Sequence, residues 1–182
     1  GALFTRYADA FSVSYREEFS TRTAVSDIEH IESLNQRVPL AVSFYRNLED
    51  EPHALRFKLF RLQQDVPLSD VLPMLENLGL RVLAGRPYRI ELKDANTVWI
   101  YDFSVRYDSD QVIDLEKVKQ KFQDAFIQTW NGAAEDDSFN RLVLSVGLEW
   151  REVAMLRAYA KYFKQTGFAF SQTYIKDALV NH

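Results

Sequence analysis

Residues 97–107 read TVWIYDFSVRY, and this run sets the interpretation of the segments around it. Its side chains alternate between two sets, with Trp99, Tyr101, Phe103 and Val105 on one side and Val98, Ile100, Asp102 and Ser104 on the other. A period of two predicts a β-strand over this run. Asp102 is either a buried, hydrogen-bonded acid or part of a half-solvated sheet face, and we favour the second interpretation.

The segments around this run predict three more strands and two helices. The runs 40–46 and 54–62 favour a β-hairpin with a polar turn between them, and the run 80–92 favours an edge strand because Gly85 and Pro87 interrupt it. The first expected helix is capped by Ser69 or Asp70, ends at Gly79 and has an apolar face of Leu68, Val71, Leu72, Leu75 and Leu78. The second expected helix runs from about Asp114 to Asn131-Gly132.

The resulting order is strand, strand, helix, strand, strand, helix. A ferredoxin-like split unit instead runs strand, helix, strand, strand, helix, strand. We therefore hypothesise that 40–46 pairs antiparallel with 54–62 and takes the place of the missing last strand. The expected fold is α+β, a ferredoxin-like antiparallel sheet of four strands with two helices, in a central domain over 37–132.

Helical segments are expected before and after this domain in the sequence, over 1–36 and 133–182. The first segment predicts two helices or one kinked helix, with cap candidates at 20–23. The second predicts a short helix capped by Ser138, a long helix over about 149–166 and a last helix capped by Ser171.

The helix over 149–166 has more apolar surface than one small domain can cover. Arg157, Lys161 and Lys164 share a narrow basic stripe, and apolar residues occupy most of the remaining circumference. We expect this surplus to contact other parts of a larger protein; the alternative is that the tyrosines simply face water. The expected interface residues are Trp150, Met155, Leu156, Tyr159, Tyr162 and Phe163.

Composition excludes several classes of function. The chain has 182 residues and no cysteine, so it forms no disulfide, Cys-zinc site or thiol nucleophile. A net charge of −4 argues against a nucleic-acid partner, and no apolar run is long enough to cross a membrane. The start at Gly1-Ala2 lacks a Met and predicts no signal peptide, so we expect a cytoplasmic piece of a longer protein.

Catalytic motifs are absent from the sequence. The glycines form neither a dinucleotide fingerprint nor a phosphate loop, and the three histidines lack metal-ligand spacing. We therefore expect no catalytic residue, no metal and no cofactor in this chain. The acidic runs 49–51 and 135–137 are better explained as solvated turns than as metal ligands.

Several segments resemble the very large bacterial NAD-specific glutamate dehydrogenases. The resemblance rests on 15–19, 24–28, 68–82, 139–144, 148–153, 156–159 and 168–172, and it covers nearly the whole chain in order. The runs Leu72-Pro73-Met74-Leu75-Glu76-Asn77 and Phe139-Asn140-Arg141-Leu142 are its most specific parts. At 85–88 an acidic residue is expected before the Arg-Pro pair, and its absence argues against a ligand role for this segment.

The resemblance implies an ACT-like module with flanking helices upstream of a catalytic domain. The parent enzyme would deaminate L-glutamate oxidatively to 2-oxoglutarate and ammonium with NAD as cofactor, and would form a homo-oligomer. This chain would then be a scaffold that contacts other domains or subunits, or alternatively a sensor for an amino-acid effector. Sensor residues would lie at the first strand–helix loop, at Gln63, Gln64, Val66, Ser69 and Asp70, but Asp65 would repel a ligand carboxylate, so we favour the scaffold.

Overall fold

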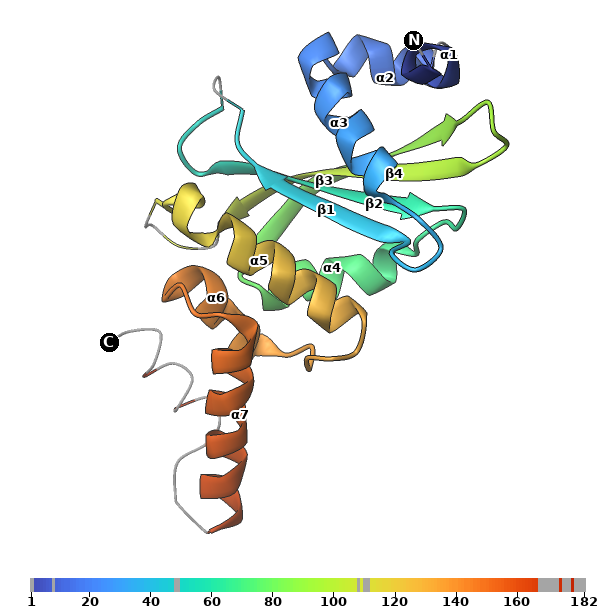
Figure 1. Ribbon diagram of the computed structural model, residues 1–182. Coiled ribbons are helices and arrows are strands. Elements are labelled where there is room, and N and C mark those ends of the chain that lie inside the picture. Colours follow the sequence, from blue (N-terminus) through green and yellow to red (C-terminus); the bar gives the residue numbers. More distant parts are fainter. Residues whose placement is uncertain are drawn as a thin grey trace.

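The computed structural model describes residues 2–7, 9–47, 50–107, 109, 112–166, 174 and 178. Its centre is a sheet of four strands, β1 (Leu40–Tyr45), β2 (Ala54–Leu62), β3 (Leu80–Glu91) and β4 (Thr97–Tyr107). The strand order is β1-β2-β4-β3, and every neighbouring pair is antiparallel. Helices lie on both sides of this sheet (Figure 1), which confirms the α+β, ferredoxin-like prediction.

Strand β1 completes the sheet, as hypothesised from the element order. It pairs with β2 from Leu40 opposite Arg61 to Tyr45 opposite Arg56. It thereby occupies the edge that the last strand of a split βαβ unit would take, although it comes first along the chain.

Strand β3 forms the other edge, as predicted for the run 80–92, and it contains the segment 85–88. Gly85 lies opposite Phe103 in the β3–β4 pair. A Cβ atom at Gly85 would approach the Phe103 ring to 2.8 Å, closer than van der Waals contact allows. The glycine is therefore a packing requirement of the sheet, which accounts for the interruption seen in the sequence.

Helices α4 (Leu68–Asn77) and α5 (Leu115–Trp130) cover one face of the sheet (Figure 1). Aromatic rings join the layers, with centroids 4.2 Å apart for Phe44 and Phe122 and 4.8 Å apart for Phe57 and Phe126. The predicted N-cap of α4, Ser69 or Asp70, is wrong, because its N-cap is Pro67 and no side chain accepts a hydrogen bond there. Leu68, assigned to its apolar face, is exposed.

The N-terminal segment covers the opposite face with three helices instead of the two expected. These are α1 (Ala2–Tyr7), α2 (Val13–Glu18) and α3 (Thr21–Ser33). The chain breaks before α2 because Ser12 caps it, with Oγ accepting from the backbone N–H of Tyr15. Ser20 caps α3 in the same way, as the cap candidates at 20–23 predicted. Tyr15, Ile31, Phe60, Tyr88 and Ile100 belong to the apolar core under these helices.

The chain leaves α5 into η1 (Ser138–Arg141), α6 (Leu142–Ser145) and α7 (Trp150–Gln165). Asp137, rather than the predicted Ser138, caps η1 by accepting from the N–H of Phe139. Helix α7 extends away from the sheet (Figure 1). The helix expected after Ser171 falls almost wholly outside the described residues. Across the described residues, no helix combines the length and apolar character needed to span a membrane.

Candidate functional site

The predicted effector loop connects β2 to α4, and its side chains bond to one another or to neighbouring strands. Gln63 has a positive φ of 63° and its side-chain amide donates to Asn96 Oδ1 at 3.2 Å. The carbonyl of the Gln64 side chain accepts from Arg61 Nη2 at 2.9 Å. Both glutamines are exposed.

In the loop before α4, the backbone N–H of Val66 is already bonded within the protein. The N–H of Val66 donates to Asp65 Oδ1 at 2.8 Å and to the hydroxyl of Tyr101 at 3.0 Å. The Tyr101 hydroxyl also donates to the Asp65 carboxylate. Asp65 and Tyr101 therefore already use this N–H group.

Ser69 and Asp70 lie in the first turn of α4 and are exposed. The Ser69 hydroxyl donates to Asp70 Oδ1 at 3.4 Å. The structure thus places the five predicted ligand residues on one short stretch. None of the five lines either of the two pockets described below. Amino-acid binding at this loop stays a prediction.

A second group of side chains attaches the N-terminal helices to the sheet, and we call it the N-terminal anchor: Tyr15, Phe19, Asp27 and Lys58. Lys58 projects from β2, and its Nζ lies 2.6 Å from Asp27 Oδ2 on α3. The Tyr15 hydroxyl donates to the same oxygen at 2.5 Å, and the Lys58 ammonium lies 3.8 Å from the centroid of the Phe19 ring. The side chains of Lys58 and Asp27 are 1% and 5% exposed, so the ion pair is shut off from water.

Burial explains the direction of one pKa in this anchor. It raises the pKa of Tyr15, and the nearby Asp27 carboxylate raises it further. The hydroxyl therefore keeps its proton and stays a hydrogen-bond donor. Because Asp27 accepts from both Lys58 and Tyr15, one carboxylate connects α3 to β2 and α2.

Asp102 lies beside the N-terminal anchor, opposite Lys58 in the β2–β4 pair. It is buried, so the half-solvated face that we favoured is wrong, and the alternative of a buried, hydrogen-bonded acid holds. Tyr45 donates to its Oδ1 and Arg56 to its Oδ2, each at 3.3 Å. Burial raises the pKa of Asp102, while Lys58 and Arg56 lower it.

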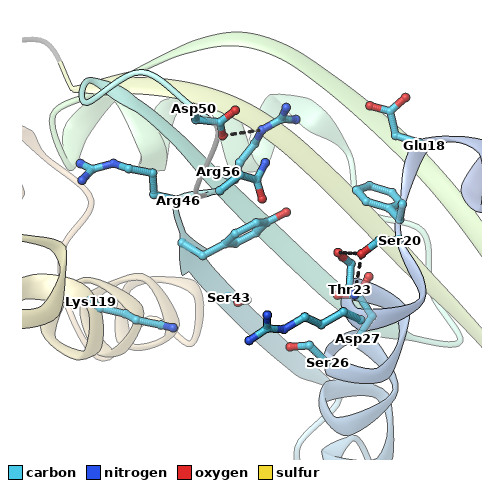
Figure 2. A pocket seen from close by; sticks show the side chains of 14 residues that line it. Glu18, Ser20, Thr23, Ser26, Asp27, Ser43, Arg46, Asp50, Arg56 and Lys119 are labelled. Atoms are coloured by element: carbon cyan, nitrogen blue, oxygen red, sulfur yellow. Dashed lines mark hydrogen bonds and ion pairs between the residues drawn. The ribbon is translucent and has the colours of Figure 1, made fainter.

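A pocket of about 770 Å³ opens between the start of α3 and the β1–β2 end of the sheet (Figure 2). Its lining combines hydroxyls and charged side chains from α3, the hairpin and α5. They include Ser26 on α3, Ser43 on β1, Arg46 and Arg56 on the hairpin, and Lys119 on α5. A smaller pocket of about 360 Å³ lies between α5 and the 144–147 segment.

A third group holds α7 against the domain, and we call it the C-terminal anchor: Glu135, Asp137, Asn140, Arg157 and Lys161. Arg157 is 3% exposed, and its guanidinium binds Asp137 with two parallel bonds, from Nε at 2.8 Å and from Nη2 at 2.9 Å. Nη2 also donates to Asn140 Oδ1 at 2.9 Å. Lys161 binds both oxygens of Glu135, at 2.7 and 2.8 Å. The acidic run 135–137 is therefore an ion-pairing segment and not just a solvated turn.

The predicted interface residues on α7 divide into two groups. Trp150 and Leu156 are partly buried and pack against the core of the domain. Met155, Tyr159 and Tyr162 are 53%, 55% and 60% exposed, and Phe163 is 40% exposed. At 100° per residue these four positions share one side of the helix, opposite the packed side of Val153, Arg157 and Ala160. We call these four residues the apolar stripe; their role as an interface stays a prediction.

The two anchors were not found in the sequence, although each left a signal there. Lys58 lies in β2 between Phe57 and Leu59, on the face that alternation also gives to Arg56 and Phe60. Arg157 belongs to a basic stripe that the structure turns toward an acidic run. In both cases the signal was a charged side chain whose partner lies far away in the sequence.

No cluster of three or more His, Asp or Glu side chains suited to a metal ion occurs within the described ranges.

The comparisons with known proteins match the chain to one family along almost its whole length. Three family models match in order: glutamate dehydrogenase helical motif 2 over 1–34, the glutamate dehydrogenase ACT3 domain over 39–118 and glutamate dehydrogenase helical motif 3 over 134–182.

Curated relatives agree with these models. The chain is 49% identical over 180 residues to an NAD-specific glutamate dehydrogenase of Halomonas elongata and 44% identical over 176 residues to one of Pseudomonas aeruginosa. It is 35% identical over 181 residues to one of Mycobacterium tuberculosis. The alignments cover 99%, 97% and 97% of this chain but 11% of each relative. With its ACT3 domain between helical motifs 2 and 3, the chain belongs to the NAD-specific glutamate dehydrogenase family.

Proposed function

We propose that this chain is a non-catalytic scaffold segment of an NAD-specific glutamate dehydrogenase. The parent enzyme would convert L-glutamate to 2-oxoglutarate and ammonium while reducing NAD. In this proposal the sheet carries helical motif 2 on one face. Helical motif 3 follows the helices that cover the other face. A cytoplasmic location and assembly of the parent into a homo-oligomer are further parts of the proposal.

The apolar stripe is the observation that carries this proposal. Met155, Tyr159 and Tyr162 are each more than half exposed, and they lie together on one side of α7. Exposed apolar residues scattered singly are normal, whereas residues gathered on one helix face are typical of a contact surface. The opposite side of α7 is fixed by Arg157, so the helix presents its apolar stripe in a defined direction.

The residues of this chain do not suit a dinucleotide. Such a site needs a glycine-rich turn from a strand into a helix, with free N–H groups for the pyrophosphate. The β2–α4 turn contains no glycine, and the Asp65 carboxylate bonds the N–H of Val66. We therefore assign the binding of NAD to other segments of the parent enzyme and derive no chemical step from this chain.

The effector loop supports the scaffold over the amino-acid sensor. Its polar groups bond to one another, and a ligand carboxylate would have to displace Asp65 from both Val66 and Tyr101. Titration calorimetry of the chain with a panel of amino acids separates the two functions. The scaffold predicts no saturable amino-acid binding that depends on this loop, whereas micromolar binding lost in Gln63→Ala or Gln64→Ala would establish the sensor.

The scaffold itself is tested in the complete enzyme. We expect the triple variant Met155→Gln, Tyr159→Gln and Tyr162→Gln to lower the sedimentation coefficient of the assembly, or to lower glutamate-dependent NAD reduction. The matched control replaces three exposed valines elsewhere, Val13, Val25 and Val38, with serine. Assembly and activity that are equal in both triple variants and in the unmodified enzyme would refute the proposal.

A further inference from the structure

The 770 Å³ pocket carries an inference that is independent of the scaffold function. Its volume falls in the range of roughly 300–1,000 Å³ that is typical of small-molecule sites. Four cationic side chains line it, although the chain as a whole carries a net charge of −4. These cations come from three separate elements: Arg22 from α3, Arg46 and Arg56 from the β1–β2 hairpin and Lys119 from α5.

Each acid that lines the pocket already has a cationic partner. Asp27 is paired with Lys58 at 2.6 Å, which is the ion pair of the N-terminal anchor. Asp50 Oδ2 lies 3.7 Å from Arg56 Nε, and this pair is drawn in Figure 2. Glu18 Oε2 lies 3.3 Å from Arg86 Nη1 at the outer rim of the pocket.

Three of the cations have no such partner. Within the part of the chain that the structure describes, Arg22, Arg46 and Lys119 form no ion pair with a carboxylate. Among the described residues, the half-buried Arg46 guanidinium donates to the carbonyls of Ala54 and Ile113, at 3.4 and 3.5 Å. These long bonds leave most of its five N–H donors available. The pocket therefore has a surplus of positive charge that its own acids do not cancel.

The start of α3 adds to this positive potential. Ser20, Thr23 and Ser26 line the pocket at this end of the helix, where the helix dipole is positive. Across the pocket, Ser43 supplies another hydroxyl from β1, and Lys119 extends toward this region from α5 (Figure 2). Hydroxyl and guanidinium groups together are suited to the oxygens of carboxylates and phosphates.

We propose that this pocket binds a small anion with two or more negative charges, either a polycarboxylate or a phosphate compound. Arg22, Arg46 and Lys119 would each bind an anionic oxygen, and Ser26 and Ser43 would donate hydrogen bonds. A single negative charge would engage one cation and leave the others unpaired. Multivalent ligands are therefore preferred over monovalent ones.

Titration calorimetry at low ionic strength tests this proposal with citrate, pyrophosphate and acetate as probes. We expect saturable one-to-one binding of citrate, pyrophosphate or both, and binding of acetate that is at least tenfold weaker. The stronger of the two multivalent probes identifies the ligand as a carboxylate or a phosphate. Because the site is electrostatic, binding should also weaken as sodium chloride is added.

Substitutions locate the site. Arg22→Ala and Lys119→Ala should each weaken binding about tenfold, as expected for the loss of one charge-assisted hydrogen bond. Lys164→Ala, an exposed cation on α7 far from the pocket, is the matched control and should leave affinity unchanged. Thermal unfolding checks that each variant folds, and the melting temperature should rise with ligand only where binding persists.

Two results would overturn the proposal. One is the absence of saturable binding of both citrate and pyrophosphate to the folded chain. The other is an equal loss of affinity in Lys164→Ala and Arg22→Ala, which would mean that the anions respond to overall charge and not to this pocket.

Discussion

The two anchors use ion pairs in opposite ways. In the N-terminal anchor, Lys58 and Asp27 are both buried, and the contact is a single short N–O distance supported by Tyr15 and Phe19. In the C-terminal anchor, Arg157 is buried but its partner Asp137 is 37% exposed, and the contact is bidentate. The first anchor must keep both charges paired, whereas the second leaves its acid able to bind water when the arginine is lost.

The largest effect is expected when the N-terminal anchor loses its acid. Asp27→Ala leaves the Lys58 ammonium buried and unpaired, so we expect the free energy of unfolding to fall by about 3–5 kcal/mol. Urea denaturation measures this change. The paired replacement of Asp27 by leucine and Lys58 by methionine is the control and should cost much less. A loss below about 1 kcal/mol in Asp27→Ala would contradict the buried pair.

A smaller effect is expected at the C-terminal anchor. Arg157→Ala removes the bidentate bond, and we expect a loss of about 1.5–3 kcal/mol because Asp137 can regain water. Hydrogen exchange should localise the change to the amides of α7, while the sheet keeps its protection. Arg157→Lys retains the charge without the bidentate geometry, so its stability should lie between that of the unmodified protein and that of Arg157→Ala. Equal loss of protection in β2 and β4 would show that the anchor is not local.

Asp102, the buried acid beside the N-terminal anchor, should make the folding stability depend on pH. Its pKa is raised in the folded protein, so the folded state holds this proton more tightly than the unfolded state does. The stabilising contribution is present below the ordinary value of 3.8 and is lost as the pH rises through the raised folded value. Stability relative to Asp102→Asn should therefore fall as the pH increases above that ordinary value. Urea midpoints of both proteins across this range measure the trend, and a difference that grows with pH would contradict it.

The smallest effect on stability is expected on the apolar stripe. Tyr159→Gln changes a side chain that is 55% exposed and lies away from both anchors. We expect the free energy of unfolding to change by less than about 0.5 kcal/mol in urea denaturation. A large loss would mean that the stripe supports this domain itself, and not a contact with another part of the enzyme.

Periodicity predicted most of the fold because local patterns determine it. The alternation in 97–107 and the apolar faces of α4 and α5 depend on residues a few positions apart, and these elements appear where they were expected. Caps were less predictable: α4 begins after Pro67 without a side-chain cap, and η1 uses Asp137 in place of the adjacent Ser138. The burial of Asp102 was missed because it depends on helices that come from a distant part of the chain.

The anchors and the pocket could not be predicted for the same physical reason. Lys58 and Asp27 are 31 residues apart, and Arg157 and Asp137 are 20 apart, so no local pattern joins them. The cations of the pocket come from three elements that only the fold brings together. Family resemblance did supply the order of modules, which composition and spacing alone did not.

The early position of β1 has a consequence for how the chain acquires its structure. Its partner strand follows after a short turn, with Leu40 opposite Arg61, so the pairing is local in sequence. A last strand placed after α5 would have to find β2 across the whole module. Lower contact order favours faster folding, and every strand leaves the ribosome before α5 does. The sheet can therefore form during synthesis, before the helices that follow it have been made.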